Sequence, residues 1–213
     1  MDPLRRDIVV LKVFSVLTAL ILSQTCKAGV VFQDDFESGN LNLWQSSGIV
    51  GAVRDNQMGG TFPSANGHYT ALFSGGSALT NGEISVIFST VGGQVYDLSF
   101  DFGTFAGQPQ SIRVTVADAT NNNMILDRSI TDPTGTFNLA NLFDHYSYQF
   151  IASSHLTRLK FNDASVSGYD SDGALDNVLI TYSSSVPEPS SAAIATLFLI
   201  GSALRYRQRR RRF

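Results

Sequence analysis

The stretch Tyr96-Asp97-Leu98-Ser99-Phe100-Asp101-Phe102 alternates large apolar residues with small or acidic ones. This period of two is typical of a β-strand with one buried face and one solvated face. The same alternation recurs over residues 112–116, 146–150 and 159–161. The pattern therefore predicts a β-rich domain whose aromatic and aliphatic side chains line the inner faces of its strands.

Shorter apolar runs extend this pattern over the rest of residues 29–185. Further strands are expected over residues 49–53, 69–74, 83–90, 124–130 and 175–182. Asn81-Gly82 predicts a type I′ turn that joins two neighbouring strands in a hairpin. About nine short strands separated by turn residues predict an all-β fold, an antiparallel two-sheet β-sandwich of the jelly-roll type.

Charge is distributed very unevenly along the chain of 213 residues, whose net charge is −3. Residues 29–189 contain five basic and sixteen acidic residues, a net charge of −11. Such an acidic segment repels phosphate backbones, so nucleic-acid binding is not expected. The single cysteine, Cys26, excludes a disulfide framework within the chain and a cysteine-based zinc site.

The N-terminus has the pattern of a secretory signal peptide over residues 1–28. Arg5 and Arg6 precede an apolar run at residues 13–22, which is short for a membrane span. Cys26-Lys27-Ala28 then provides a small-x-small site, which predicts cleavage after Ala28. An uncleaved N-terminal anchor and a lipoprotein modified at Cys26 are the alternatives.

The C-terminal segment, residues 186–213, combines three features. Val186-Pro187-Glu188-Pro189 is followed by an apolar stretch, for which we expect a transmembrane helix at about residues 190–204. Fifteen helical residues span roughly 22 Å, which is short but tolerable where the bilayer thins. The basic residues that follow, and that would hold this end on the cytoplasmic side, are Arg205, Arg207, Arg209, Arg210, Arg211 and Arg212.

This order of Pro-Glu-Pro, short apolar helix and terminal arginine cluster resembles the PEP-CTERM sorting signal of Gram-negative bacteria. The resemblance implies that the secretion machinery exports the protein across the inner membrane and that the membrane protease exosortase then removes the tail. Pro187, Glu188 and Pro189 would be the recognition element. The middle domain would be anchored only transiently and end at the outer surface or in extracellular polysaccharide. An ordinary tail anchor with a chance Pro-Glu-Pro is the alternative.

The middle domain resembles the galactose-binding-like jelly rolls that often precede such tails. The segments that carry this resemblance are Phe32-Gln33-Asp34-Asp35-Phe36-Glu37-Ser38-Gly39, Tyr96-Asp97-Leu98-Ser99-Phe100-Asp101-Phe102 and Ala174-Leu175-Asp176-Asn177-Val178-Leu179-Ile180. The resemblance implies that the first and last strands lie side by side and that loops at one end bind sugars. Aromatic candidates for sugar stacking are Trp44, Tyr69, Phe105 and Tyr169, which the sequence does not assign to any one face.

Acidic residues cluster near both ends of the domain. Asp34 and Glu37 lie at the start of the domain, on its entry loop, and Asp176 lies in its last expected strand. If the first and last strands of the domain pair, the two acidic groups could meet, and oxygen ligands of this kind suit Ca²⁺. Related jelly rolls often carry a structural calcium ion at this place, so we consider calcium as a cofactor and no other. The alternative is that these residues are solvated turn aspartates.

No catalytic motif stands out in the chain. There is no Gly-x-Ser-x-Gly elbow, no His-Glu-x-x-His and no phosphate-binding glycine loop. His68, His145 and His155 are scattered and are interpreted as solvated loop residues. The sequence therefore favours a non-catalytic carbohydrate-binding module at the cell surface, associated with extracellular polysaccharide. A structural or adhesion protein without a small ligand and, less favoured, a glycan hydrolase remain the alternatives.

Overall fold

The structure, a computed structural model, describes most of the middle of the chain. The described residues are 28–55, 65, 67–77, 79–104, 109–132, 143–166 and 171–183. The predicted signal peptide up to Lys27, the sorting motif at residues 186–189, the helix at about 190–204 and the arginines beyond it lie outside these ranges. None of the described segments is a helix with the length and apolar character needed to cross a membrane.

Residues 28–183 form one unit that contains all the described strands and both sheets. The six-stranded sheet has the order β3-β4-β11-β6-β9, and β1 also pairs with β11. Every pairing in it is antiparallel. Its strands are β1 (Ala28–Asp34), β3 (Val50–Arg54), β4 (Tyr69–Ser77), β6 (Val95–Thr104), β9 (Phe143–Ile151) and β11 (Ser171–Ser183).

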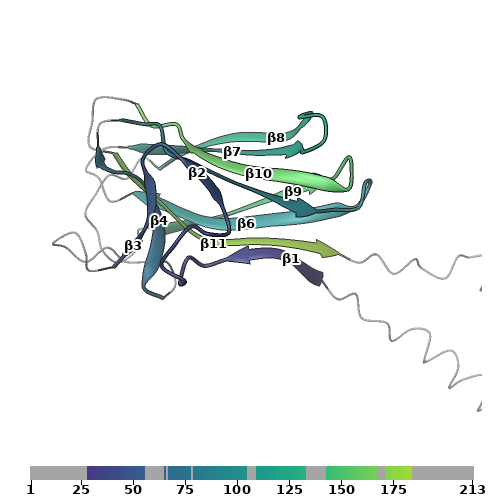
Figure 1. The fold of residues 1–213 in the computed structure, drawn as a ribbon, viewed down its shortest axis with the longest axis horizontal. Helices are drawn as coiled ribbons and strands as arrows, with labels where there is room; N and C mark the ends of the chain where they lie inside the picture. The colour runs from purple at the N-terminus through teal and green to yellow at the C-terminus, as the bar shows by residue number, and fades with distance from the viewer. Residues whose placement is uncertain are drawn as a thin grey trace, which may run out of the picture. The chain divides into compact units, whose positions relative to one another are not determined.

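The second sheet has five strands in the order β2-β5-β10-β7-β8, again all antiparallel. Its strands are β2 (Gln45–Ser47), β5 (Glu83–Ser89), β7 (Gln110–Asp118), β8 (Met124–Asp132) and β10 (Leu156–Asp163). In Figure 1, β7, β8 and β10 lie on one side of the sandwich, and β6, β11 and β1 lie on the other. The predicted all-β fold with two antiparallel sheets is therefore confirmed.

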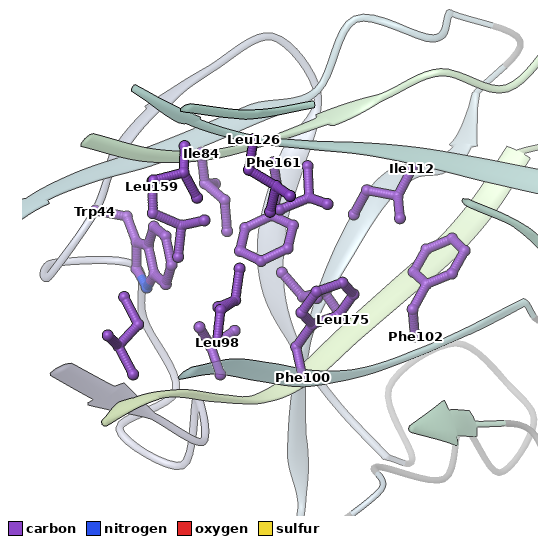
Figure 2. Close-up of a cluster of buried hydrophobic side chains, with 14 of the residues drawn as sticks. Trp44, Ile84, Leu98, Phe100, Phe102, Ile112, Leu126, Leu159, Phe161 and Leu175 are labelled. Atoms are coloured by element: carbon purple, nitrogen blue, oxygen red, sulfur yellow. The ribbon is translucent and has the colours of Figure 1, made fainter. Parts of the chain in front are cut away.

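The core fills the space between the two sheets, as the alternating patterns predict. Phe100 and Leu98 of β6 have no exposed surface, and neither do Leu159 and Phe161 of β10 in the opposite sheet. Figure 2 shows these side chains pointing toward one another from the two layers. Because β6 and β10 bury every second residue, the residues between them lie on the outer faces of the two sheets.

One sequence-based expectation about the connections is wrong. Asn81-Gly82 does not form a hairpin turn, because β4 and β5 lie in different sheets. The Asn81 side-chain oxygen instead accepts a hydrogen bond from the backbone N–H of Ile49 at 3.0 Å. The Gly82 carbonyl accepts one from the N–H of Asp163 at 2.8 Å. The local pattern suits a hairpin, but both strands bury apolar residues in separate layers, and this packing decides the path of the chain.

Candidate functional site

Asp34, the first of the predicted calcium ligands, has a structural role at the end of β1. β1 pairs with β11 and places Asp34 opposite Val178, so the expected neighbourhood of the first and last strands is confirmed. The Asp34 side chain is buried and accepts two hydrogen bonds. They come from the backbone N–H of Phe36 at 2.9 Å and from the indole N–H of Trp44 at 2.7 Å. Asp34 thereby fixes both the loop after β1 and a core tryptophan.

Glu37, the second predicted ligand, connects this loop to the start of β4. Its Oε1 atom accepts the backbone N–H of His68 at 2.6 Å and that of Tyr69 at 2.7 Å. Two backbone donors at the beginning of an edge-proximal strand are satisfied in this way. The carboxylate is therefore directed at the chain itself and not toward the other two predicted ligands.

Asp176, the third, is fully buried in β11. Its Oδ1 accepts the backbone N–H of Asn177 at 2.7 Å, and its Oδ2 accepts that of Ala65 at 2.8 Å. Within the described ranges no group of three or more His, Cys, Asp or Glu side chains is placed to hold a metal ion. The predicted calcium set of Asp34, Glu37 and Asp176 is thus not assembled, because each carboxylate serves backbone donors of a different segment. Asp34 and Asp176 are not solvated turn residues either, since both are buried, although Asp34 caps a local turn through the Phe36 N–H.

Two histidines lie beside carboxylates on the surface. His145 Nδ1 is 2.7 Å from Asp101 Oδ1, and His68 Nδ1 is 2.8 Å from Asp55 Oδ2. Both histidine side chains are exposed by more than half. Among the described residues neither histidine is hydrogen-bonded to a serine, threonine or cysteine side chain, so neither pair is part of a hydrolase triad there.

A groove of about 320 Å³ lies on the outer face of the five-stranded sheet. We call it the outer groove. Its lining includes residues from all five strands of that sheet and one from the turn between β7 and β8. The residues that define it are Gln45, Glu83, Ser85, Thr115, Ala117, Asn122, Met124, Arg158 and Lys160.

The alternation of β10 explains the position of the outer groove. Leu159 and Phe161 point into the core, so Arg158 and Lys160 lie on the opposite face. β10 lies between β5 and β7 in the sheet, and Lys160 pairs with Ser85 on one side and Thr115 on the other. Two small residues beside a long side chain leave space above the sheet, and this space is the groove.

Arg158 is held by a residue of the neighbouring turn. Its Nη1 donates a hydrogen bond to the Asn122 side-chain oxygen at 2.8 Å. Asn122 adopts a left-handed backbone conformation with φ of 61°, and its N–H donates to the Asp118 carbonyl at 2.8 Å. The turn between β7 and β8 thus presents the Asn122 side chain to the guanidinium group and orients it.

Asp118 anchors that turn. Its carboxylate accepts the hydroxyl of Thr120 at 2.6 Å and the backbone N–H of the same residue at 2.8 Å. It also accepts the hydroxyls of Ser154 at 2.9 Å and Ser153 at 3.0 Å. These bonds, those of Thr120 first, hold the pKa of Asp118 well below its usual range, because they stabilise the ionised form. The hydrogen bonds of Asp118 are therefore made within the turn and to Ser153 and Ser154, and none of these bonds goes to Arg158.

Lys160 and its neighbours give the groove further polar groups. Lys160 Nζ lies 3.1 Å from Glu83 Oε2, across the β10–β5 pair. The side chains of Gln45, Ser85 and Thr115 make no hydrogen bond to any other side chain or backbone group of the described residues. Their amide and hydroxyl groups are accordingly available to a bound molecule.

A second arginine on the same face is neutralised by a close partner. Arg113 of β7 binds Asp127 of β8 through two bonds, Nε to Oδ1 at 2.8 Å and Nη2 to Oδ2 at 2.5 Å. The Arg113 hydrogen bond lowers the pKa of Asp127, and Asp127 raises the pKa of Arg113. Because this carboxylate is engaged by Arg113, it does not offset the charge of Arg158.

Of the aromatic residues singled out in the sequence, the two that the structure describes, Trp44 and Tyr69, do not line the groove. Trp44 is buried in the core, between Phe32 and Phe161. Tyr69 is partly buried at the start of β4 in the other sheet. Phe105 and Tyr169 lie outside the described residues. Arg158, Ser85 and Thr115 were not predicted from the sequence; continuing the alternation around Leu159 by one residue would have placed Arg158 on the same wet face as Lys160.

The sequence model of the family described as "Protein of unknown function (DUF642)" matches residues 28–181, nearly the whole sandwich. No curated protein matches the sequence.

Several solved structures share the fold. The CBM22-1 xylan-binding domain from Paenibacillus barcinonensis Xyn10C has a TM-score of 0.51 at 13% identity, over 75% of this chain and 97% of that one. The C-terminal family 22 carbohydrate-binding module of Clostridium thermocellum Xyn10B has a TM-score of 0.51 at 15% identity, over 74% of this chain and 96% of that one. The K1 cleaved adhesin domain of Lys-gingipain from Porphyromonas gingivalis W83 has a TM-score of 0.50 at 14% identity, over 71% of this chain and 98% of that one. At such identities the similarity establishes a β-sandwich like that of carbohydrate-binding modules, and only the fold.

Proposed function

We propose that the β-sandwich of this chain, which belongs to the DUF642 family, is a non-catalytic module that binds polysaccharide in the outer groove. The observation that carries the proposal is the direction of the groove. Its lining crosses β2, β5, β10, β7 and β8 in turn. Five strands at a spacing of about 4.8 Å span about 19 Å, enough for several sugar units of an extended chain.

The chemistry of the lining suits a polyhydroxylated ligand. The groove presents hydroxyl groups from Ser85 and Thr115, an amide from Gln45 and cations from Arg158 and Lys160. Sugars offer many hydroxyl donors and acceptors, and polar groups at fixed positions provide specificity for them. Strands of a sheet hold these side chains more rigidly than loops do, which lowers the entropy lost on binding.

The comparisons support this proposal at the level of fold. Two of the similar structures are carbohydrate-binding modules, one of them a xylan-binding domain. The study of the second concerns amino acids in its cleft and their role in ligand binding. By analogy, a cleft on a sheet face of this chain is a reasonable binding site, but such a fold hosts many functions. The residues of the outer groove therefore provide the main support for the proposal.

We also propose that the module acts outside the cell. The signal-like residues 1–28 and the order of Pro187-Glu188-Pro189, apolar stretch and arginines support export and exosortase processing. In this proposal the domain reaches the outer surface or the extracellular polysaccharide, where its ligand is found. The secretion machinery and exosortase are then its partners during export.

A glycan array probed with residues 28–183 tests the binding proposal. Ala117 lies on the floor of the outer groove, so Ala117→Trp fills the groove without entering the core. Ser147 lies on the outer face of the other sheet, and Ser147→Trp is the matched control. We expect Ala117→Trp to weaken glycan binding about tenfold or more, with Ser147→Trp unchanged. No glycan signal for the unmodified domain, or equal loss in both variants, contradicts the proposal.

A further inference from the structure

We infer that the outer groove is built for an acidic polysaccharide, in which Arg158 binds a carboxylate group of a uronate unit. This inference rests on the proposed function, because it names the class of glycan that the groove accepts. Arg158 would then be the residue that determines specificity between charged and uncharged sugar chains.

The first observation is the position of the basic residues in an acidic domain. Residues 29–189 carry a net charge of −11 and only five basic residues. Four of these five lie on strands of the five-stranded sheet, namely Arg113, Arg128, Arg158 and Lys160. The groove lining itself holds two cations, Arg158 and Lys160, and one acid, Glu83. The groove is therefore locally positive, whereas the domain is strongly negative.

Screening decides which of these charges a bound ligand experiences. The Debye length at physiological ionic strength is about 8 Å, so exposed acids farther away have little effect. Glu83 and Asp127, two acids on strands of this sheet, are each paired with a cation, Lys160 and Arg113 respectively. A carboxylate in the groove consequently meets the field of Arg158 more than that of the distant acids.

The second observation is the state of Arg158. Lys160, Arg113 and Arg54 each lie within ion-pair distance of a carboxylate. Within the described part of the chain, Arg158 forms no such pair, and its bond to the Asn122 amide occupies one of five guanidinium donors. The planar guanidinium matches a carboxylate through two parallel hydrogen bonds. The Asn122 contact orients the group in advance, so binding a carboxylate does not require Arg158 to leave another acid.

The third observation is that none of the described lining residues carries an aromatic ring. Ligand sites are generally lined mainly by apolar and aromatic groups, and sugar rings pack well on aromatic faces. Among the described lining residues only Ala117 and Met124 are apolar, and the others are polar or charged. Binding energy in such a groove must come mostly from hydrogen bonds and from attraction between opposite charges. An acidic polysaccharide can form both kinds of interaction, whereas a neutral polysaccharide can form only the hydrogen bonds.

The test uses two forms of one polymer. Residues 28–183 contain both sheets and the whole core, so this fragment can be titrated with polygalacturonate and with its fully methyl-esterified form. The two polymers share a backbone and differ only in whether each carboxyl group is a free carboxylate or a neutral methyl ester. We expect the acidic form to bind at least about tenfold more tightly, the range of a charge-assisted hydrogen-bonded pair.

Substitutions then assign this preference to one residue. Arg158→Gln should remove most of the preference for the acidic form, and Arg158→Lys should keep part of it, because the charge remains and the planar fork is lost. Arg128→Gln removes the same charge from the same sheet outside the groove lining and is the matched control, with binding expected to be unchanged. Thermal melting of each variant confirms that the fold is intact.

The outcomes separate this inference from the proposed function. Equal affinity for both polymers, with binding still blocked by Ala117→Trp, overturns the acidic preference and leaves a neutral polysaccharide module. Equal losses in Arg158→Gln and Arg128→Gln indicate unspecific attraction and overturn the inference, as does equally tight binding of single-stranded DNA. Failure to bind any glycan overturns the inference and the proposed function together.

Discussion

Phe100 of β6 and Phe161 of β10 meet edge to face between the two sheets, with ring centroids 5.0 Å apart and ring planes at 79°. Both side chains are fully buried. Figure 2 shows them at the centre of the cluster. Aromatic pairs in this geometry add to the stability gained by burial. The contact connects the six-stranded sheet to β10, the strand that places Arg158 and Lys160 in the outer groove.

Replacing Phe100 by alanine should destabilise the domain by about 3–5 kcal/mol, because a large buried side chain is lost and a cavity remains. The free energy of unfolding in urea measures the effect. Ser147→Ala, at an exposed position on neighbouring β9, should stay within about 0.5 kcal/mol. A small loss for Phe100→Ala would mean that the sheets do not pack as described. Asp101 is no neutral control, since its carboxylate binds Asn177 and His145.

Asp34→Ala should cost roughly 2–4 kcal/mol, because the Trp44 indole and the Phe36 backbone N–H lose a buried acceptor. Asp35→Ala is the matched control, since Asp35 accepts only a longer bond of 3.3 Å from Glu37, and its cost should be below about 1 kcal/mol. Melting curves recorded with millimolar calcium and with chelator should show the same difference between the variants. A loss that appears only in calcium would restore Asp34 as a metal ligand.

Stability should fall in acid partly through Asp118. Its pKa in the folded domain is lowered, so the folded state binds the proton less readily than the unfolded chain. The stabilisation is fully present above the ordinary aspartate pKa of about 4 and is lost as the pH falls below it. Asp118→Asn should therefore be less stable at neutral pH and should show a shallower decline between about pH 4 and pH 2. Parallel acid curves for the two proteins would contradict this.

Processing of the tail should be visible by mass. In a host that has exosortase, we expect surface protein to lack the segment after Pro187-Glu188-Pro189, as the resemblance to PEP-CTERM signals implies. Mass spectrometry of surface-exposed protein measures this. A variant in which Glu188 is changed to alanine should retain the tail. Intact residues 209–213 on most wild-type molecules would argue instead for an ordinary tail anchor.

The fold was more predictable than the site, and particular residues show why. The alternation around Phe100 and around Leu159 depends only on neighbours in sequence, so the strands and their buried faces could be predicted. Asn81-Gly82 misled because a local turn signal carries no information about which sheet receives the next strand. Here the packing of β4 and β5 into different sheets overrides the local preference of Asn81-Gly82 for a hairpin turn.

The site depends on contacts between residues far apart in the chain. Arg158 becomes distinctive only when Asn122, thirty-six positions away, reaches its guanidinium. Likewise, Asp34 and Asp176 look like metal ligands in sequence, but the backbone N–H groups of Phe36 and Ala65 use their oxygens. Hydrophobic alternation predicts which residues lie on a face. It does not predict which of them are already engaged by other groups.

Locating the bound glycan on the domain is the most direct test of polysaccharide binding in the outer groove. Amide chemical shifts of residues 28–183 can be followed by NMR while a ligand found on the glycan array is added. We expect saturable shifts centred on Ser85, Thr115 and Lys160 of the outer groove, with little change along β9 of the other sheet. Shifts confined to loops at one end of the sandwich, or to the outer face of the six-stranded sheet, would contradict it.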